Sequence, residues 1–191
     1  VVTGGPGVVR EAMLSGKKVI AAGPGNPPAV VDETADIPLA ARNIVAGASL
    51  DNNIICTAEK EVVVVASVAN ELKRHMAACG CVEVTGGDIE RLCGVIFESR
   101  QGRKGVINKK WIGKNANLIL REIGIDAPAS TRLVLCEVDR DHPLPWTEQL
   151  MPVMPIVRVA NVDEAIDLAL AYEGGRRHTA TMHSRNVEKL S

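Results

Sequence analysis

The sequence predicts an α/β fold in which helices cover both faces of a mostly parallel sheet. Segments with strand character alternate with segments of helical periodicity along the chain, which is the pattern of βαβ units. Hydrophobic residues make up 46% of the chain but aromatic residues only 2%, so Val, Ile, Leu and Ala must form the core, as in buried parallel strands. Glu61–Ala66 is apolar on both faces and is expected to be a central strand. A chain of 191 residues can bury the core of one domain.

The first part of the chain predicts a helix, a strand and a second helix. Proline is pre-organised for the first helical position, so a helix is expected over Pro6–Ser15, and Gly16 suits its C-terminal cap. Lys18–Ala22 is expected to be a strand. Ile37–Ser49 has the spacing of an amphipathic helix. Its expected buried face consists of Ile37, Ala40, Ala41, Ile44, Val45 and Ala48.

The alternation continues after the central strand. Helices are expected at Val68–Ala78, Asp88–Val95, Asn115–Ile123 and Val162–Tyr172, and strands at Gly80–Val84, Arg132–Glu137, Pro155–Ala160 and Thr179–His183. Asn161 is placed to cap the last of these helices, with Glu164 in the position of a capping box. Two stretches predict irregular structure, because Arg100–Lys110 is polar and basic and Pro143–Pro155 contains four prolines.

Charge and composition argue against several classes of protein. Lys and Arg total 22 against 23 Asp and Glu, and few aromatic residues are present to stack on bases, so nucleic acid is not an expected partner. Since no apolar run approaches the ~20 residues that cross a bilayer, no membrane partner is expected either. The five cysteines lack the spacing of a disulfide framework. Cys79-x-Cys81, with His75 and Cys93 nearby, lacks the spacing of structural zinc sites, so no metal is expected.

The segment Asp51–Glu61 holds the candidate nucleophile. Asn52 or Asn53 is placed to cap a short helix, which would leave Cys56 in the first helical turn. A helix dipole favours negative charge there and promotes the thiolate, the nucleophilic form of cysteine. The alternative is a buried structural cysteine, since free cysteine is among the most buried residue types.

The glycine turn near the start of the chain is a second candidate. The run Thr3-Gly4-Gly5-Pro6-Gly7 joins the end of an apolar strand to a helix. It fails the dinucleotide-binding pattern because Arg10 stands in place of the third glycine, and Gly16-Lys17-Lys18 fails the P-loop pattern because Glu11 stands in place of its first glycine. The turn could present N–H groups of a helix N-terminus to an anion, or it could be a plain strand–helix turn.

Five segments resemble, in the same order, the CoA-acylating aldehyde dehydrogenases of bacterial propanediol and ethanolamine utilisation. They are Val1–Val9, Lys18–Pro28, Asp51–Glu61, Thr147–Val157 and His178–Ser184, and the resemblance covers essentially the whole chain. It implies an aldehyde-dehydrogenase-like catalytic domain over residues 1–191. It also implies a longer parent, in which a nucleotide-binding region precedes this domain and a further segment returns afterwards.

The resemblance implies roles for particular residues. Cys56 matches the nucleophile, with Asn53, Ile55 and Thr57 close to its thiol. Thr3, Gly4 and Gly5 match the turn against the nicotinamide end of NAD, and Glu148 matches the glutamate that holds a ribose. Leu150 follows in the same cofactor-facing loop, where Leu150-Met151 replaces the more common Phe-Gly. His183 is a possible acid–base group, with a packed histidine as the alternative, and His142 and His178 have weaker claims.

The implied reaction oxidises a short-chain aldehyde with NAD and transfers the acyl group to coenzyme A. Propanal is favoured over acetaldehyde. Hydrolytic aldehyde dehydrogenases carry a water-activating glutamate in the segment that here reads Ala21-Ala22-Gly23. Without that general base, the acyl-enzyme is expected to wait for the CoA thiol. The hydrolytic reaction is therefore the disfavoured alternative.

The resemblance also implies partners and a location. The parent is expected to be a homo-oligomer in the cytoplasm, inside a bacterial microcompartment, in contact with shell or neighbouring enzymes. A non-catalytic assembly module of such a compartment is the alternative from another functional class. Arg176-Arg177 and Arg100–Lys110 could meet CoA phosphates, although a solvated surface is their default interpretation.

Overall fold

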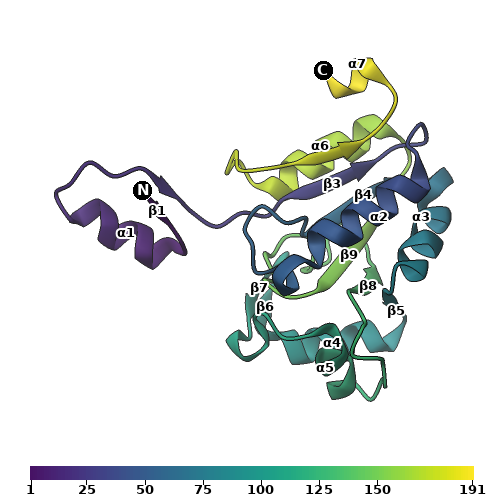
Figure 1. Ribbon diagram of the computed structural model, residues 1–191, viewed down its shortest axis with the longest axis horizontal. Coiled ribbons are helices and arrows are strands. Elements are labelled where there is room, and N and C mark those ends of the chain that lie inside the picture. The colour runs from purple at the N-terminus through teal and green to yellow at the C-terminus, as the bar shows by residue number, and fades with distance from the viewer.

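A six-stranded parallel sheet forms the centre of the molecule (Figure 1). The computed structural model describes all 191 residues, apart from the side chain of Pro6. The strands are β3 (Pro28–Val31), β4 (Glu61–Val65), β5 (Val82–Val84), β8 (Val134–Glu137), β9 (Val153–Val159) and β10 (Thr181–His183). They lie in the order β10-β3-β4-β9-β8-β5 with parallel neighbours throughout. The predicted parallel sheet is therefore confirmed, and β4 is an interior strand with all its residues buried.

Helices cover both faces of this sheet, as predicted. On one face, α2 (Ile37–Ala48) and α3 (Ala66–Ala78) pack against Val62 and Val64. Successive residues of a strand face opposite sides, so Val63 faces α6 (Val162–Glu173) on the other face. There, α4 (Gly87–Ile96) and α5 (Ala116–Glu122) cover the β8 side of the sheet. The six residues expected to form the buried face of α2 are all buried.

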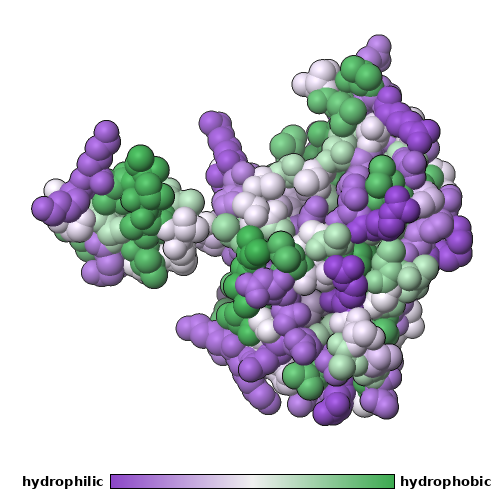
Figure 2. Space-filling view, viewed as in Figure 1, coloured by the Kyte–Doolittle hydropathy of each residue, from purple (hydrophilic) through white to green (hydrophobic). Residues whose placement is uncertain are grey.

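The first 22 residues form a small unit that projects from the sheet domain (Figure 1). It consists of β1 (Val2–Thr3), α1 (Pro6–Leu14) and β2 (Ala21–Ala22), with β1 and β2 paired in parallel. An extended segment joins it to β3. Several of its apolar side chains are exposed, and they form the green surface of this unit in Figure 2. The predicted helix is confirmed, whereas the strand expected over Lys18–Ala22 has shrunk to two residues.

Two regions differ from the sequence prediction. The interior strand β3 was not predicted, because it follows Pro27 and begins at Pro28, and prolines disfavour strand pairing. The loop expected over Arg100–Lys110 is wrong, since β6 (Phe97–Gln101) and β7 (Lys104–Ile107) form an antiparallel hairpin there, followed by the short helix η2 (Lys109–Trp111). The buried ring of Phe97 lies directly over Gly105, so a tertiary contact stabilises strands with polar sequences.

The remaining helices agree with the sequence. Asn161 caps α6, its side-chain oxygen accepting a bond from the Glu164 N–H at 3.0 Å, and the Glu164 carboxylate accepts one from the Ala160 N–H at 2.9 Å. A final helix, α7, spans Val187–Leu190. None of the helices in the described structure is long and apolar enough to cross a membrane.

Candidate active site

Four loops meet where the parallel strands begin. Gly25 precedes β3, Cys56 precedes β4, Glu148 precedes β9 and His178 precedes β10. Strands that run in parallel have their amino ends at one edge of the sheet, so residues far apart in the sequence converge there. The contacts agree, because the Gly25 N–H donates to the Glu148 carboxylate at 3.3 Å and a Cβ at Gly25 would overlap the Cys56 carbonyl oxygen.

Cys56 lies in a turn, so the helix expected around it is wrong. After α2, a short 3₁₀ segment η1 (Leu50–Asn53) reverses the chain. Asp51, Asn52 and Asn53 adopt left-handed conformations with φ of 50°, 50° and 65°, which Asn and Asp tolerate better than other non-glycine residues. No helix follows this left-handed run, and residues 54–58 form turns and bends. The asparagines therefore form the turn, and Asn52 reaches outward to the Gly113 carbonyl at 3.0 Å.

Below Cys56, Asn53 and Lys60 form a buried polar cluster. The Asn53 amide donates to the carbonyl oxygens of Ala48 at 2.7 Å and Glu59 at 2.9 Å. The Lys60 ammonium donates to the backbone and side-chain oxygens of Asn53, both at 2.7 Å, and to the Ile55 carbonyl at 3.0 Å. These bonds join the end of α2, the loop that carries Cys56 (residues 54–60, called the cysteine loop below) and the start of β4. Sequence reasoning missed Lys60, because nothing local marks a lysine as buried.

A cleft of about 350 Å³ lies between the projecting unit and the cysteine loop. Its lining consists of Thr3, Gly4, Gly5, Gly23, Pro24, Ile54, Ile55, Cys56, Glu148 and Leu150. The structure thus brings together most of the residues that the resemblance assigned to the site. Asn53 and Thr57 lie outside this lining: Asn53 is buried in the cluster below, and Thr57 is exposed.

Two ionisable groups near the cleft are the Glu148 carboxyl, which lines it, and the Lys60 ammonium, which is buried beneath the cysteine loop. Burial raises the pKa of Glu148, and Lys60 and the Gly25 N–H oppose that rise. Burial also lowers the pKa of Lys60 to about 8, opposed most strongly by Glu148 and then by Cys56. The ammonium therefore keeps its proton for the most part at neutral pH, close to both groups.

Asn26 and Glu61 support this edge of the sheet from inside. Both are fully buried. The Asn26 amide donates to the Glu61 carboxyl at 3.1 Å and to the carbonyl oxygens of Pro145 at 2.9 Å and Tyr172 at 3.1 Å. Burial raises the pKa of Glu61 well above its ordinary value. Glu61 is buried because it begins the interior strand β4.

The structure separates the histidines. His183 ends β10 and borders a different cavity with Asp36 and Arg185, at the opposite edge of the sheet from Cys56. His178 precedes β10, and its ring packs against Gly25, which contacts the Cys56 carbonyl. The two histidines flank the same strand, so the signal that separates them is which end each occupies. The arrangement gives no support to an acid–base role of His183 at the thiol.

The segment that lacks a glutamate also borders the cleft. Gly23 and Pro24 line it, while Ala21 and Ala22 form β2 with exposed side chains. Among the described residues of Ile20–Pro28, no ionisable side chain lines the cleft. Glu148 is the carboxyl group of the lining, and its bond to the Gly25 N–H holds it.

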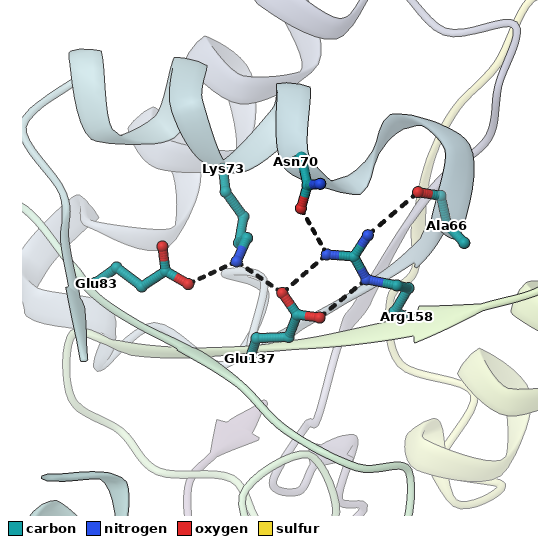
Figure 3. Close-up of polar contacts among 6 residues, drawn as sticks. All are labelled: Ala66, Asn70, Lys73, Glu83, Glu137 and Arg158. Atoms are coloured by element: carbon teal, nitrogen blue, oxygen red, sulfur yellow. Dashed lines mark hydrogen bonds and ion pairs between the residues drawn. The ribbon is translucent and has the colours of Figure 1, made fainter. Parts of the chain in front are cut away.

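A second charged cluster lies at the carboxyl edge of the sheet (Figure 3). Lys73 contacts Glu83 at 2.6 Å and Glu137 at 2.7 Å. Arg158 donates two bonds to Glu137, at 2.9 and 3.0 Å, and further bonds to Asn70 at 2.8 Å and to the Ala66 carbonyl at 3.2 Å. Chiefly through Arg158, the pKa of Glu137 falls to about 2. The cluster joins α3 to β5, β8 and β9.

Fold and site place the chain among α/β domains that present a loop cysteine in a cleft beside a glycine turn. The model of the aldehyde dehydrogenase family matches residues 2–191, and the chain belongs to that family.

Relatives at high identity include acylating enzymes. The chain is 51% identical over 193 residues to the acetaldehyde dehydrogenase (acetylating) EutE of Salmonella typhimurium, and 46% identical over 191 residues to a propanal dehydrogenase (CoA-propanoylating) of the same organism, covering all of this chain in both. A solved propionaldehyde dehydrogenase of Rhodopseudomonas palustris, with bound CoA and an acylated cysteine, matches 99% of the chain with a TM-score of 0.92 and 44% identity. The chain spans 41%, 40% and 43% of these three proteins, respectively.

Proposed function

We propose that this chain is the cysteine-bearing catalytic domain of an NAD-dependent, CoA-acylating aldehyde dehydrogenase. The observation that carries the proposal is the cleft, where Cys56, the glycine turn Thr3–Gly5 and Glu148 meet. In the proposed reaction, a short-chain aldehyde becomes an acyl-CoA. Propanal is the favoured substrate and acetaldehyde the alternative, and relatives named for both substrates match the chain.

Cys56 carries the acyl group in this proposal. Its thiolate attacks the aldehyde carbon, a C–S bond forms, and the carbonyl oxygen takes up the electron pair. The Cys56 backbone N–H is the expected donor to that oxygen. Loss of hydride from the same carbon then restores the C=O bond and leaves a thioester on Cys56. The CoA thiolate then attacks the carbonyl carbon of this thioester, the bond between that carbon and the Cys56 sulfur breaks, and acyl-CoA and the Cys56 thiolate are released.

The residues of the cleft fit the nicotinamide end of NAD, which supplies the hydride acceptor when it is bound. A Cβ placed at Gly5 would meet nothing within 4 Å, so the turn leaves open space along the cleft wall. Glu148 offers a carboxyl group that can hold ribose hydroxyls. Leu150 lines the same cleft. Its φ of 55° is a left-handed conformation, which is uncommon for leucine.

One feature favours CoA over water as the second nucleophile. The segment Ala21–Pro24 contributes no general base, and a positioned base is typically worth about 10²–10⁴-fold in rate. A separate feature concerns the aldehyde: the lining is mainly apolar, with Ile54, Ile55 and Leu150 beside Cys56, which suits a short aliphatic chain.

The proposal includes the setting inferred from the sequence resemblance. The complete enzyme is a homo-oligomer in the cytoplasm, held inside a bacterial microcompartment and in contact with shell or neighbouring enzymes. A purely structural role in that compartment is the competing hypothesis. Capture of the complete protein by shell protein, without aldehyde-dependent labelling of Cys56, would favour the competing role.

The test is an assay of NADH formation from propanal by the complete protein, with and without CoA. Sustained turnover is expected only with CoA. Without CoA, we expect at most one equivalent of NADH per Cys56, because the thioester has no second nucleophile. Sustained NADH formation with free propionate as product, in the absence of CoA, would instead identify a hydrolytic enzyme.

A further inference from the structure

The cysteine loop depends on Lys60 for its shape. Three left-handed residues precede the loop, and the backbone bonds within it are sparse turn contacts, Ile54 N–H to the Asp51 carbonyl at 3.2 Å and Ala58 N–H to the Ile55 carbonyl at 3.1 Å. Lys60 adds three short bonds to oxygens of Asn53 and Ile55. Cys56 follows Ile55 directly, so the ammonium fixes the carbonyl on its amino-terminal side.

An ammonium group fits this position for a stereochemical reason. It has three N–H donors and no acceptor, and all three are used here. Bonds from a charged donor are about twice as strong as neutral ones. An uncharged side chain of similar length, such as methionine, would leave three buried oxygens without this donor.

Burial of Lys60 costs free energy because the ammonium loses its hydration, and a contribution to stability alone does not explain this cost. Lys60 is 0% exposed, and lysine is almost never fully buried unless it is paired. Its three partners are carbonyl and amide oxygens without formal charge. The groups that oppose its desolvation are Glu148, Cys56, Glu61 and Glu59, in that order.

The carboxyl groups around Lys60 do not form ion pairs with it in the described structure. Burial raises the pKa of Glu61, of Glu148 and of Glu59, whose carboxyl lies over Gly47 of α2. The direct contacts of the ammonium are therefore its three bonds to oxygens of Asn53 and Ile55.

We propose that Lys60 is a positioning residue for Cys56: its three bonds hold the cysteine loop against Gly25. The inference rests on the proposed function, in which Cys56 is the nucleophile. Lys60 touches neither substrate nor cofactor in this account. It acts through the backbone of the loop.

The experiment measures kcat and KM for aldehyde in the complete enzyme, together with the rate at which iodoacetamide alkylates Cys56 at one pH. In Lys60→Met, we expect the alkylation rate to change together with kcat, because the displaced loop carries the thiol with it. We expect kcat to fall by about 10²-fold with little change in KM, since a small displacement of a reacting group has an effect of that order.

Lys60→Arg separates charge from geometry. It keeps the positive charge, but the planar guanidinium cannot reproduce the three bonds of an ammonium. If the three bonds matter, kcat should fall in this variant although the charge is kept. The control is Lys73→Met, which removes a lysine from the ion pairs at the opposite edge of the sheet and should lower stability without changing kcat or the alkylation rate.

An unchanged alkylation rate in Lys60→Met, with kcat equal to that of Lys73→Met, would overturn the inference. If Lys60→Met does not fold, Lys60→Arg decides, and wild-type kcat in that variant would overturn it. Failure of the proposed function gives a different result, because the wild-type enzyme itself would then lack CoA-dependent turnover, or Cys56→Ala would retain it.

Discussion

At the scale of single residues, exposure and position separate Cys56 from the other four cysteines. Cys56 is half-buried and lines the cleft, Cys79 is half-buried but lies outside the cleft lining, and Cys81, Cys93 and Cys136 are buried. Burial raises the pKa of Cys81 to about 12 and that of Cys93 to about 11, and it raises the pKa of Cys136 further. These three remain thiols at neutral pH and are poor nucleophiles.

Alanine variants of the five cysteines test this distinction. We expect Cys56→Ala to abolish acyl-CoA formation by the complete enzyme, because no other thiol lines the described cleft. Cys79→Ala, Cys81→Ala, Cys93→Ala and Cys136→Ala should keep most of the activity. The buried ones lose about 1 kcal/mol of stability from the cavity left behind. Steady-state kinetics with propanal and CoA decide, and appreciable turnover by Cys56→Ala would refute the assignment.

The absent glutamate leads to a second prediction at this scale. Placing a glutamate at Ala21 or Ala22 of the complete enzyme should shift product from acyl-CoA towards free acid, because a carboxylate beside Gly23 could activate water near the thioester. The gain should be less than the ~10²-fold of an evolved base, since its orientation is not optimised.

The measurement is the ratio of propionate to propionyl-CoA at saturating CoA and at zero CoA. Both positions must be tried, because both side chains are exposed on β2 and only one can face the thioester. If neither variant raises propionate while both still form the acyl-enzyme, the missing base does not enforce CoA dependence.

At the scale of secondary-structure elements, the ion-pair cluster of Figure 3 joins α3 to three strands. Glu137 on β8 accepts bonds from Arg158 on β9 and from Lys73 on α3. Its folded-state pKa, about 2, lies below the ordinary value of 4.5. A carboxyl group with a depressed pKa adds stability above its unfolded pKa, and that stability is lost as the pH falls through the interval from 4.5 to 2.

Glu137→Gln should therefore lower the free energy of unfolding at pH 7 by about 1–2 kcal/mol, after allowance for solvent screening. Near pH 3 the difference from wild type should become smaller. Urea unfolding at the two pH values measures both quantities. Glu83→Gln is the matched control, since it removes one bond to Lys73 and leaves the Arg158 pair intact. An equal loss of stability at pH 7 and pH 3 would contradict the account.

At the scale of the whole molecule, the sheet domain and the projecting unit together form the cleft, and packing holds the sheet domain more firmly than the projecting unit. The sheet domain holds Cys56 and Glu148 on loops that its core fixes, whereas Thr3–Gly5 belongs to the projecting unit (Figure 1). That unit keeps Val8, Met13, Leu14 and Ile20 largely exposed. The side of the cleft that we propose to bind the nucleotide is therefore held by less packing than the other side.

We accordingly expect the isolated 191-residue chain to bind NAD⁺ weakly and to show no dehydrogenase activity. Binding energy from parts of a cofactor remote from the reaction is needed to hold it for the chemical step, and the cleft contacts are confined to its nicotinamide end. Calorimetric titration of residues 1–191 with NAD⁺ checks this. Tight binding would contradict the expectation.

The sequence by itself determined the features that depend on local pattern. Periodicity gave the helices, including every buried residue of α2, and the unbroken valine run placed β4 in the sheet interior. Asp51, Asn52 and Asn53 indicated a turn before Cys56. Such signals suffice because helix periodicity, strand alternation and turn propensity are properties of neighbouring residues.

Tertiary structure alone decided which of these residues meet. It set Cys56 in a turn instead of a helix, buried Lys60 beneath it, and placed His178, not His183, at the same edge of the sheet. Contacts such as Gly25 to Glu148, which are 123 residues apart, depend on the register of parallel strands. Burial and electrostatic environment arise from such long-range neighbours, so the sequence could name the nucleophile but not the groups that hold it in position.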